Sequence, residues 1–82
     1  MKRTLKEKLQ YNEARHTPFS IGYGLGVMLY SDYKKMDSRG KQVISDIIGS
    51  NKRLARNGDE MGKGFMCGVR DAANERKSKH KH

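Results

Sequence analysis

The sequence contains one cysteine, one proline and no tryptophan, and it has no long apolar run. Its single cysteine, Cys67, cannot form an internal disulfide, whereas small secreted domains are usually cross-linked, so we expect a reducing, cytoplasmic environment. No window approaches the roughly 20 apolar residues that cross a bilayer. The N-terminal Met1-Lys2-Arg3-Thr4-Leu5 lacks the apolar core of a signal peptide. We therefore expect a soluble protein that does not enter a membrane.

Motifs of catalytic and metal sites are also scarce. The stretch from Gly58 to Gly64 resembles a phosphate-binding loop, but it has one residue too few between the glycines and a glycine where Ser or Thr should hold magnesium. Gly22, Gly24 and Gly26 do not have the spacing of a dinucleotide-binding turn. A structural zinc site needs four ordered ligands, and two of the 3 histidines, His80 and His82, lie in the polar C-terminal tail. We expect no enzymatic activity, no cofactor and no metal.

Positive charge is the most prominent feature that is present. The chain has 18 Lys and Arg against 9 Asp and Glu, a formal net charge of +9, and a pI near 9.9. Such a balance indicates a polyanionic partner, most readily RNA or a ribonucleoprotein, with DNA and an acidic protein surface as alternatives. Solubility alone is the competing explanation of the same charge. The positive charge is concentrated at both chain ends and in the centre.

A chain of 82 residues forms one domain. Only 34% of its residues are hydrophobic, so its core is small, and a partner or homodimerisation is a way to complete it. We expect an all-α fold of three or four short helices over residues 1–76, in which residues 1–16 form either a weakly anchored helix or a flexible arm. Residues 77–82 are too polar to pack and are expected to be a mobile basic tail.

The clearest helix is predicted between Asp37 and Gly58. Asp37 or Ser38 can cap its first turn, and Asn57-Gly58 is typical of a left-handed stop. Apolar residues recur every three or four positions, which predicts one stripe along the helix. The members of this stripe are Val43, Ile44, Ile47, Ile48, Leu54 and Ala55.

Small residues predict how two further helices pack. Asp59 can cap a helix in which Gly64, Gly68 and Ala72 recur every four residues. In residues 19–36, apolar residues alternate with small ones, as in a strand. Gly22 and Gly26 are also four residues apart, which fits a helix with small residues along one side. No partner strand is evident, so helix is favoured, beginning near Thr17-Pro18 or Ser20. Two such helices could cross at their glycines.

The two segments Gly22-Tyr23-Gly24-Leu25-Gly26 and Gly64-Phe65-Met66-Cys67-Gly68 share the form Gly-aromatic-any-any-Gly. The pair resembles the glycine-aromatic helices of ribosome modulation factor and its small bacterial and phage relatives. The resemblance implies a short, basic, helical protein that binds ribosomal RNA. The chain departs from that family in lacking its Asn-Pro-Tyr turn and its tryptophans, and in having a long helix between the two motifs.

Two functional hypotheses follow. In the first, the protein binds a nucleic acid or ribonucleoprotein through basic side chains, with Lys52 and Arg56 one turn apart on the side opposite Ile47 and Ile48. In the second, it is a regulator or inhibitor, of the kind phages encode, that binds a host protein through an apolar patch. The candidate nucleic-acid contacts are Lys41, Lys52, Arg53, Arg56, Arg76, Lys77 and Lys79, and the candidate protein interface is Phe19, Tyr23, Met28 and Met66.

Overall fold

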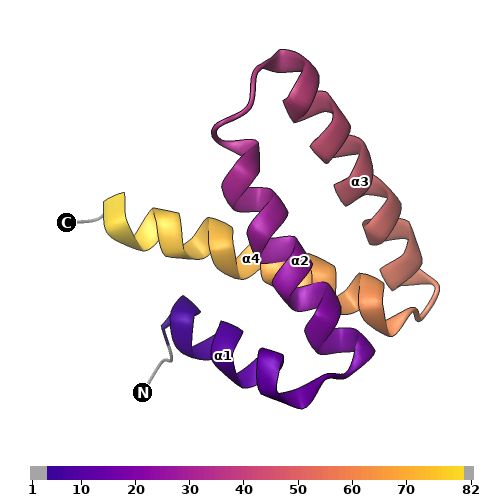
Figure 1. Cartoon of the computed structure of the whole chain (residues 1–82). Helices are drawn as coiled ribbons and strands as arrows, with labels where there is room; N and C mark the ends of the chain where they lie inside the picture. The colour runs from indigo at the N-terminus through magenta and orange to yellow at the C-terminus, as the bar shows by residue number, and fades with distance from the viewer. Residues whose placement is uncertain (1–3, 81–82) are drawn as a thin grey trace.

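The computed structural model describes the backbone of residues 4–80 and the side chains of residues 4–74. Across this backbone the chain forms four helices and no strand, which confirms the predicted all-α class. The helices are α1 (Leu5–Arg15), α2 (Pro18–Tyr33), α3 (Ser38–Arg56) and α4 (Glu60–His80), as Figure 1 shows. The helical prediction for residues 19–36 is confirmed for residues 19–33, and the strand alternative is wrong. Residues 34–36 belong to the turn between α2 and α3.

Short polar side chains fix where the helices begin. Asp37 accepts a hydrogen bond from the Gly40 N–H at 2.9 Å, and Asp59 accepts one from the Gly62 N–H at 2.7 Å. Pro18 occupies the first turn of α2, with Thr17 as its N-cap. After α3 the chain turns at Gly58, whose φ of 91° lies in the left-handed region. These boundaries agree with those expected from the sequence.

The N-terminal segment is a helix because it is capped and anchored. The Thr4 N–H donates to the Glu7 carboxylate at 2.9 Å, and the Glu7 N–H donates back to the Thr4 hydroxyl at 3.2 Å. This reciprocal pair satisfies two of the free N–H groups at the start of α1. Leu5 and Leu9, one turn apart, pack against the core. Between the two alternatives for residues 1–16, the structure therefore shows the anchored helix for the described part, over Leu5–Arg15.

The crossing of α2 and α4 organises the molecule. At Gly22 and at Gly26 an added Cβ would overlap the carbonyl oxygen of Met61 or of Phe65, respectively. The glycines of α4 lie in the same way against the backbone of α2. A Cβ at Gly64 would overlap the Phe19 carbonyl oxygen, and one at Gly68 would overlap that of Tyr23. The predicted glycine crossing is thus confirmed, since backbone lies directly on backbone at all four positions.

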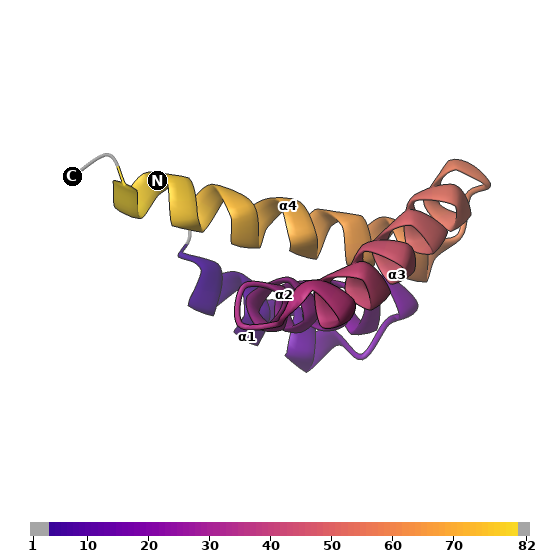
Figure 2. The same ribbon diagram turned by 90° about the horizontal axis from the view of Figure 1, so that it is seen from above.

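The helices form two layers. Figure 2 shows α4 on one side of α1 and α2, while α3 slopes from the α2 layer towards the start of α4. The principal extents of 37 × 35 × 18 Å describe a flat molecule, and 18 Å is less than twice the roughly 10–12 Å diameter of a helix. Few hydrophobic side chains are therefore fully covered. The hydrophobic residues buried in this thin core are Tyr23, Val27, Ile44, Phe65 and Ala72.

Helix α4 continues past the expected domain boundary. The backbone is helical through His80, so the change from helix to tail predicted at residue 76 is not seen in the backbone. The side chains predicted to carry the basic tail, Arg76, Lys77 and Lys79, lie outside the described residues. None of the described helices is both long enough and apolar enough to span a bilayer.

Candidate nucleic-acid interface

Helix α3 presents a basic flank. With 100° per residue, Lys41, Lys52 and Arg56 fall within an arc of about 60°, and Arg53 lies about 60° further round. Lys52 and Arg56 are separated by about 6 Å along the helix axis, and Lys41 lies about 17 Å before Lys52. All four side chains are exposed. We call these four residues the basic flank.

The cations of the basic flank make no ion pair with the Asp and Glu side chains that the structure describes. Gly49 lies between Lys41 and Lys52 on the same side of the helix, and a Cβ there would meet nothing within 4 Å. The surface between the cations is therefore open. An incoming phosphate could pair with these ammonium and guanidinium groups without first breaking an internal ion pair.

The apolar stripe of α3 is only partly used by the fold. Ile44 is 4% exposed, and Ile48 and Ala55 are half-buried on the same side. Val43 and Leu54, on the other flank, are 58% and 46% exposed. The basic flank borders Ile48, so the expectation that Lys52 lies opposite Ile48 is wrong. Only one side of α3 is covered because α3 belongs to a thin two-layer fold (Figure 2).

An aromatic and cationic cluster lies where α2 ends and α3 begins. The rings of Tyr30 and Tyr33 are nearly parallel, at 14°, with centroids 6.2 Å apart. The Lys34 ammonium lies 5.4 Å from the centroid of the Tyr30 ring. The Lys41 ammonium lies 5.6 Å from that of Tyr33. Lys41 therefore belongs both to this cluster and to the basic flank.

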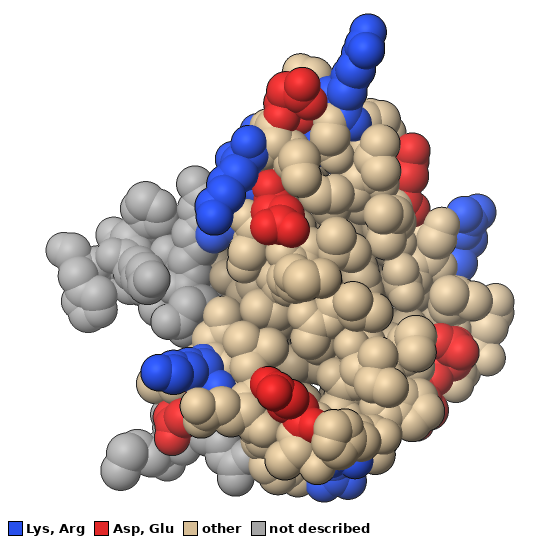
Figure 3. Space-filling view, in the orientation of Figure 1, with Lys and Arg blue, Asp and Glu red and all other residues tan. Residues whose placement is uncertain are grey.

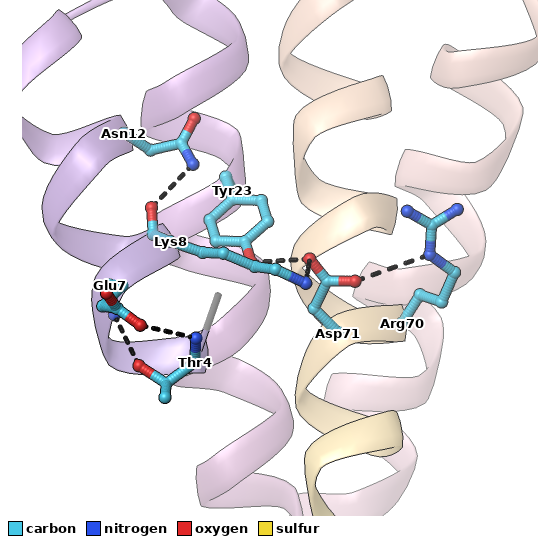
Figure 4. Close-up of polar contacts among 7 residues, drawn as sticks. All are labelled: Thr4, Glu7, Lys8, Asn12, Tyr23, Arg70 and Asp71. Atoms are coloured by element: carbon cyan, nitrogen blue, oxygen red, sulfur yellow. Dashed lines mark hydrogen bonds and ion pairs between the residues drawn. The ribbon is translucent and has the colours of Figure 1, made fainter. Parts of the chain in front are cut away.

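A polar node at Asp71 ties three helices together (Figure 4). The Tyr23 hydroxyl of α2 donates to the Asp71 carboxylate of α4 at 2.7 Å. The Lys8 ammonium of α1 lies 3.6 Å from the same oxygen, and Arg70 Nε lies 3.6 Å from the other. Burial, followed by the hydrogen bond and negative charge of Asp71, raises the pKa of Tyr23 far above that of an ordinary tyrosine. The node stabilises the fold and is not an open site.

The predicted protein-interface residues do not form one patch. Tyr23 is 3% exposed and belongs to the core, so it cannot contact a partner or stack on a base. Phe19 and Met66 are half-buried. Met28 is 51% exposed but lies on the side of α2 that faces away from α4. In the sequence, Tyr23 and Met28 both fit an apolar helix. Only the packing of α4 shows that Tyr23 is buried and Met28 is exposed.

The exposed side of α2 carries a different apolar surface. Ile21, Leu25 and Met28 are 49%, 39% and 51% exposed. With Leu9 of α1 they line an open groove of about 330 Å³, which also contains Glu13. Figure 3 views this side of the molecule and shows a broad central area without charged side chains, with charges of both signs around it. The sequence did not show that Ile21 and Leu25 lie at the surface, because helical spacing of apolar residues does not say which side of the helix another helix covers.

No chemistry-bearing cluster accompanies these surfaces in the part of the chain with described side chains. Within residues 4–74, no three His, Cys, Asp or Glu side chains converge as metal ligands would. Cys67 is a free, half-buried thiol beside the core.

Comparison of the chain with protein-family models, with curated proteins and with solved structures found no match. The resemblance to ribosome modulation factor therefore stays a prediction from two short segments. The site has to be interpreted from its own residues.

Among those residues, the sequence identified the α3 cations but did not show that Lys34 and Lys41 lie over the Tyr30 and Tyr33 rings. The signal was present as Tyr30, Tyr33 and Lys34 at one helical turn, followed by Lys41. The sequence did not show that α3 folds back so that Lys41 reaches the Tyr33 ring.

Proposed function

We propose that this protein is a small, non-enzymatic nucleic-acid-binding protein that contacts RNA or a ribonucleoprotein through the basic flank of α3. The observation that supports the proposal is the set of exposed cations at Lys41, Lys52, Arg53 and Arg56, which make no ion pair with the acidic side chains described for residues 4–74. The net charge of +9 adds attraction at longer range. The resemblance to ribosome modulation factor supports RNA over DNA as the partner.

The mechanism is neutralisation of phosphates. Each cation that pairs with a phosphate releases a condensed counterion, so binding weakens as salt is added. On a single strand, the logarithm of the association constant falls with the logarithm of the salt concentration by about 0.7 for each phosphate contacted. Phosphate contacts position the nucleic acid but do not identify its bases. The flank is thus expected to give affinity with little sequence preference.

The test compares salt dependence in two triple variants. Lys52→Ala/Arg53→Ala/Arg56→Ala removes three charges of the basic flank, and Lys6→Ala/Arg15→Ala/Lys63→Ala removes three exposed charges elsewhere. The measurement is fluorescence anisotropy with labelled RNA, repeated over a range of salt concentrations. The first variant should lose affinity, and its slope of log association constant against log salt concentration should become shallower by about 2. The second variant should change the slope much less. Binding that is insensitive to salt, or equal losses in both variants, would remove the proposal.

A second candidate function is regulation of a protein, and the groove between α1 and α2 favours it. Ile21, Leu25 and Met28 recur at helical spacing, and Glu13 adds a carboxylate at the groove. This combination fits an amphipathic helix with an apolar side and a Lys or Arg beside it. Such a partner would be a host factor of the kind that phage regulators bind.

The two candidates separate in a pull-down after nuclease treatment. Wild-type protein and Leu25→Glu are used as bait, because Leu25 is exposed and its substitution leaves the basic flank intact. A stoichiometric protein that wild type retains and Leu25→Glu loses supports the second candidate. Loss of all partners on nuclease treatment supports RNA binding instead.

A further inference from the structure

The tyrosine–lysine cluster extends the basic flank at its N-terminal end. Tyr33 is the last residue of α2, and Lys41 lies in the first turns of α3. The polypeptide reverses direction between them, and this reversal brings the Lys41 ammonium to 5.6 Å from the Tyr33 ring centroid. The same ammonium begins the row that continues to Lys52 and Arg56.

The position of the lysines identifies the accessible ring faces. Lys34 and Lys41 are exposed side chains, and each ammonium lies over a tyrosine ring. Both rings are half-buried, and on these faces they are covered by exposed, flexible lysine side chains that can move aside. Tyr30 also packs in part against the core, which holds it in place. Tyr33 is half-buried and stacks on Tyr30, so its ring is held in a fixed orientation.

We propose that Tyr33 and Lys41, supported by Tyr30 and Lys34, form a stacking site for an unpaired base of single-stranded RNA. The inference rests on the proposed function and adds the kind of RNA that is bound. A flat aromatic face accepts any base, because every base has a π-face. Bases inside a duplex already stack on both sides, so only an unpaired base can use the ring.

Stacking would rearrange the lysines. The incoming base takes the place of the Lys41 ammonium over the Tyr33 ring, and the displaced ammonium pairs with a neighbouring phosphate. The strand then continues along α3, where Lys52 and Arg56 supply the next cations. A positively charged track with an aromatic platform at one end is the arrangement by which proteins bind single strands with little sequence preference.

The experiment measures affinity for two probes, a labelled oligouridylate and an RNA duplex of equal length. Tyr33→Leu removes the π-face and keeps an apolar side chain, so affinity for oligouridylate should fall by about 5- to 150-fold. Duplex affinity and its salt slope should stay unchanged. Tyr33→Phe keeps the ring and should bind as wild type does.

Tyr11→Leu is the matched control. Tyr11 is also an exposed tyrosine with a cation over its ring, since the Arg15 guanidinium carbon lies 5.4 Å from its centroid, but it belongs to α1. Its substitution should leave oligouridylate binding unchanged. An equal loss in Tyr11→Leu and Tyr33→Leu would overturn the assignment of the site to Tyr33.

The outcomes separate this inference from the proposed function. If Tyr33→Leu binds oligouridylate as wild type does while the α3 triple variant does not, the stacking site is wrong and the basic flank stands. If Tyr33→Leu weakens single-strand and duplex binding equally, the stacking site is also wrong. If wild type binds neither probe at low salt, the proposed function itself fails.

A second measurement needs no variant. Ultraviolet cross-linking of wild-type protein to oligouridylate, followed by mass spectrometry of the peptides, should place the cross-link at Tyr33 or Tyr30. Cross-links confined to Tyr11 or to the α1 peptide would overturn the inference. This arm remains decisive even if Tyr33→Leu does not fold.

Discussion

At the scale of single residues, the Tyr23 hydroxyl and the Asp71 carboxylate form the principal polar contact inside the fold. The hydrogen bond joins α2 to α4, and Lys8 adds α1 to the same carboxylate. Asp71 has only 13% of its side chain exposed, so its charge is retained in the thin core by these partners.

Removal of the Tyr23 hydroxyl should destabilise the protein. Tyr23→Phe keeps the ring in the core but deletes a hydrogen bond to a charged acceptor, which is worth about 1.5–3 kcal/mol. Urea denaturation should show a loss of this size. Tyr11→Phe is the control, because its hydroxyl accepts a bond from Arg15 on the exposed side of α1. That change should stay within about 0.5 kcal/mol, and an equal loss in both would contradict the role of the Asp71 node.

The raised pKa of Tyr23 predicts a dependence on alkaline pH. In the unfolded chain the phenol ionises near its model value of 10.0, whereas in the folded protein it stays protonated to higher pH. Above pH 10 the unfolded state therefore binds fewer protons than the folded state, and stability falls as pH rises. Below that pH the contribution is fully present. Unfolding free energies at neutral and at alkaline pH should show a steeper decline for wild type than for Tyr23→Phe, and parallel declines would contradict the prediction.

At the scale of helices, the contact between α2 and α4 depends on the absence of side chains. Gly22, Gly26, Gly64 and Gly68 let the two backbones touch, and a methyl group at any of them would meet a carbonyl oxygen of the other helix. A backbone cannot move aside as a flexible side chain can, so the helices would have to separate.

The glycine crossing predicts that two Gly→Ala substitutions change the stability of the protein in opposite directions. Gly68→Ala should lower the free energy of unfolding by about 1–3 kcal/mol or more, because the added methyl group overlaps the Tyr23 carbonyl oxygen. Gly49→Ala, in the middle of α3 and open to solvent, should raise it by about 0.5–1 kcal/mol through helix propensity alone. Thermal unfolding followed by circular dichroism measures both. If Gly68→Ala also stabilised the protein, the close crossing would be refuted.

At the scale of the whole molecule, stability rests on a thin core. An 82-residue domain is expected to have a free energy of unfolding of about 4–12 kcal/mol. Large apolar side chains on α2 and α3 remain at the surface, so few residues supply the burial. The exposed apolar area also keeps open the prediction that a partner or a second copy of the chain completes the fold.

Phe65 should therefore be decisive for folding. It is 2% exposed and its backbone lies against Gly26 at the crossing. Phe65→Ala should cost about 3–5 kcal/mol, a large part of the total stability. Met61→Ala, one turn earlier and 39% exposed, should cost about 1 kcal/mol or less. Denaturant titration of the two variants tests this, and similar losses would mean that the core is centred elsewhere.

The sequence by itself determined the helices and one contact between them. Local signals at Pro18, Asp37, Gly58 and Asp59 fix helix ends because a cap acts within one turn of its own residue. The glycine spacing predicted the crossing of α2 and α4 because small residues four apart form a continuous seam on one side of a helix. The basic flank of α3 was also predictable, since it lies within one element.

Only the tertiary structure decided which surfaces remain free. Periodicity finds an apolar side of a helix but does not say whether another helix covers it, so Tyr23 proved buried while Ile21, Leu25 and Val43 proved exposed. The Tyr33–Lys41 pair and the Tyr23–Asp71 bond join residues from different helices. Such contacts depend on how separate helices pack against one another, which is a property of the packed molecule and is not encoded in any one segment.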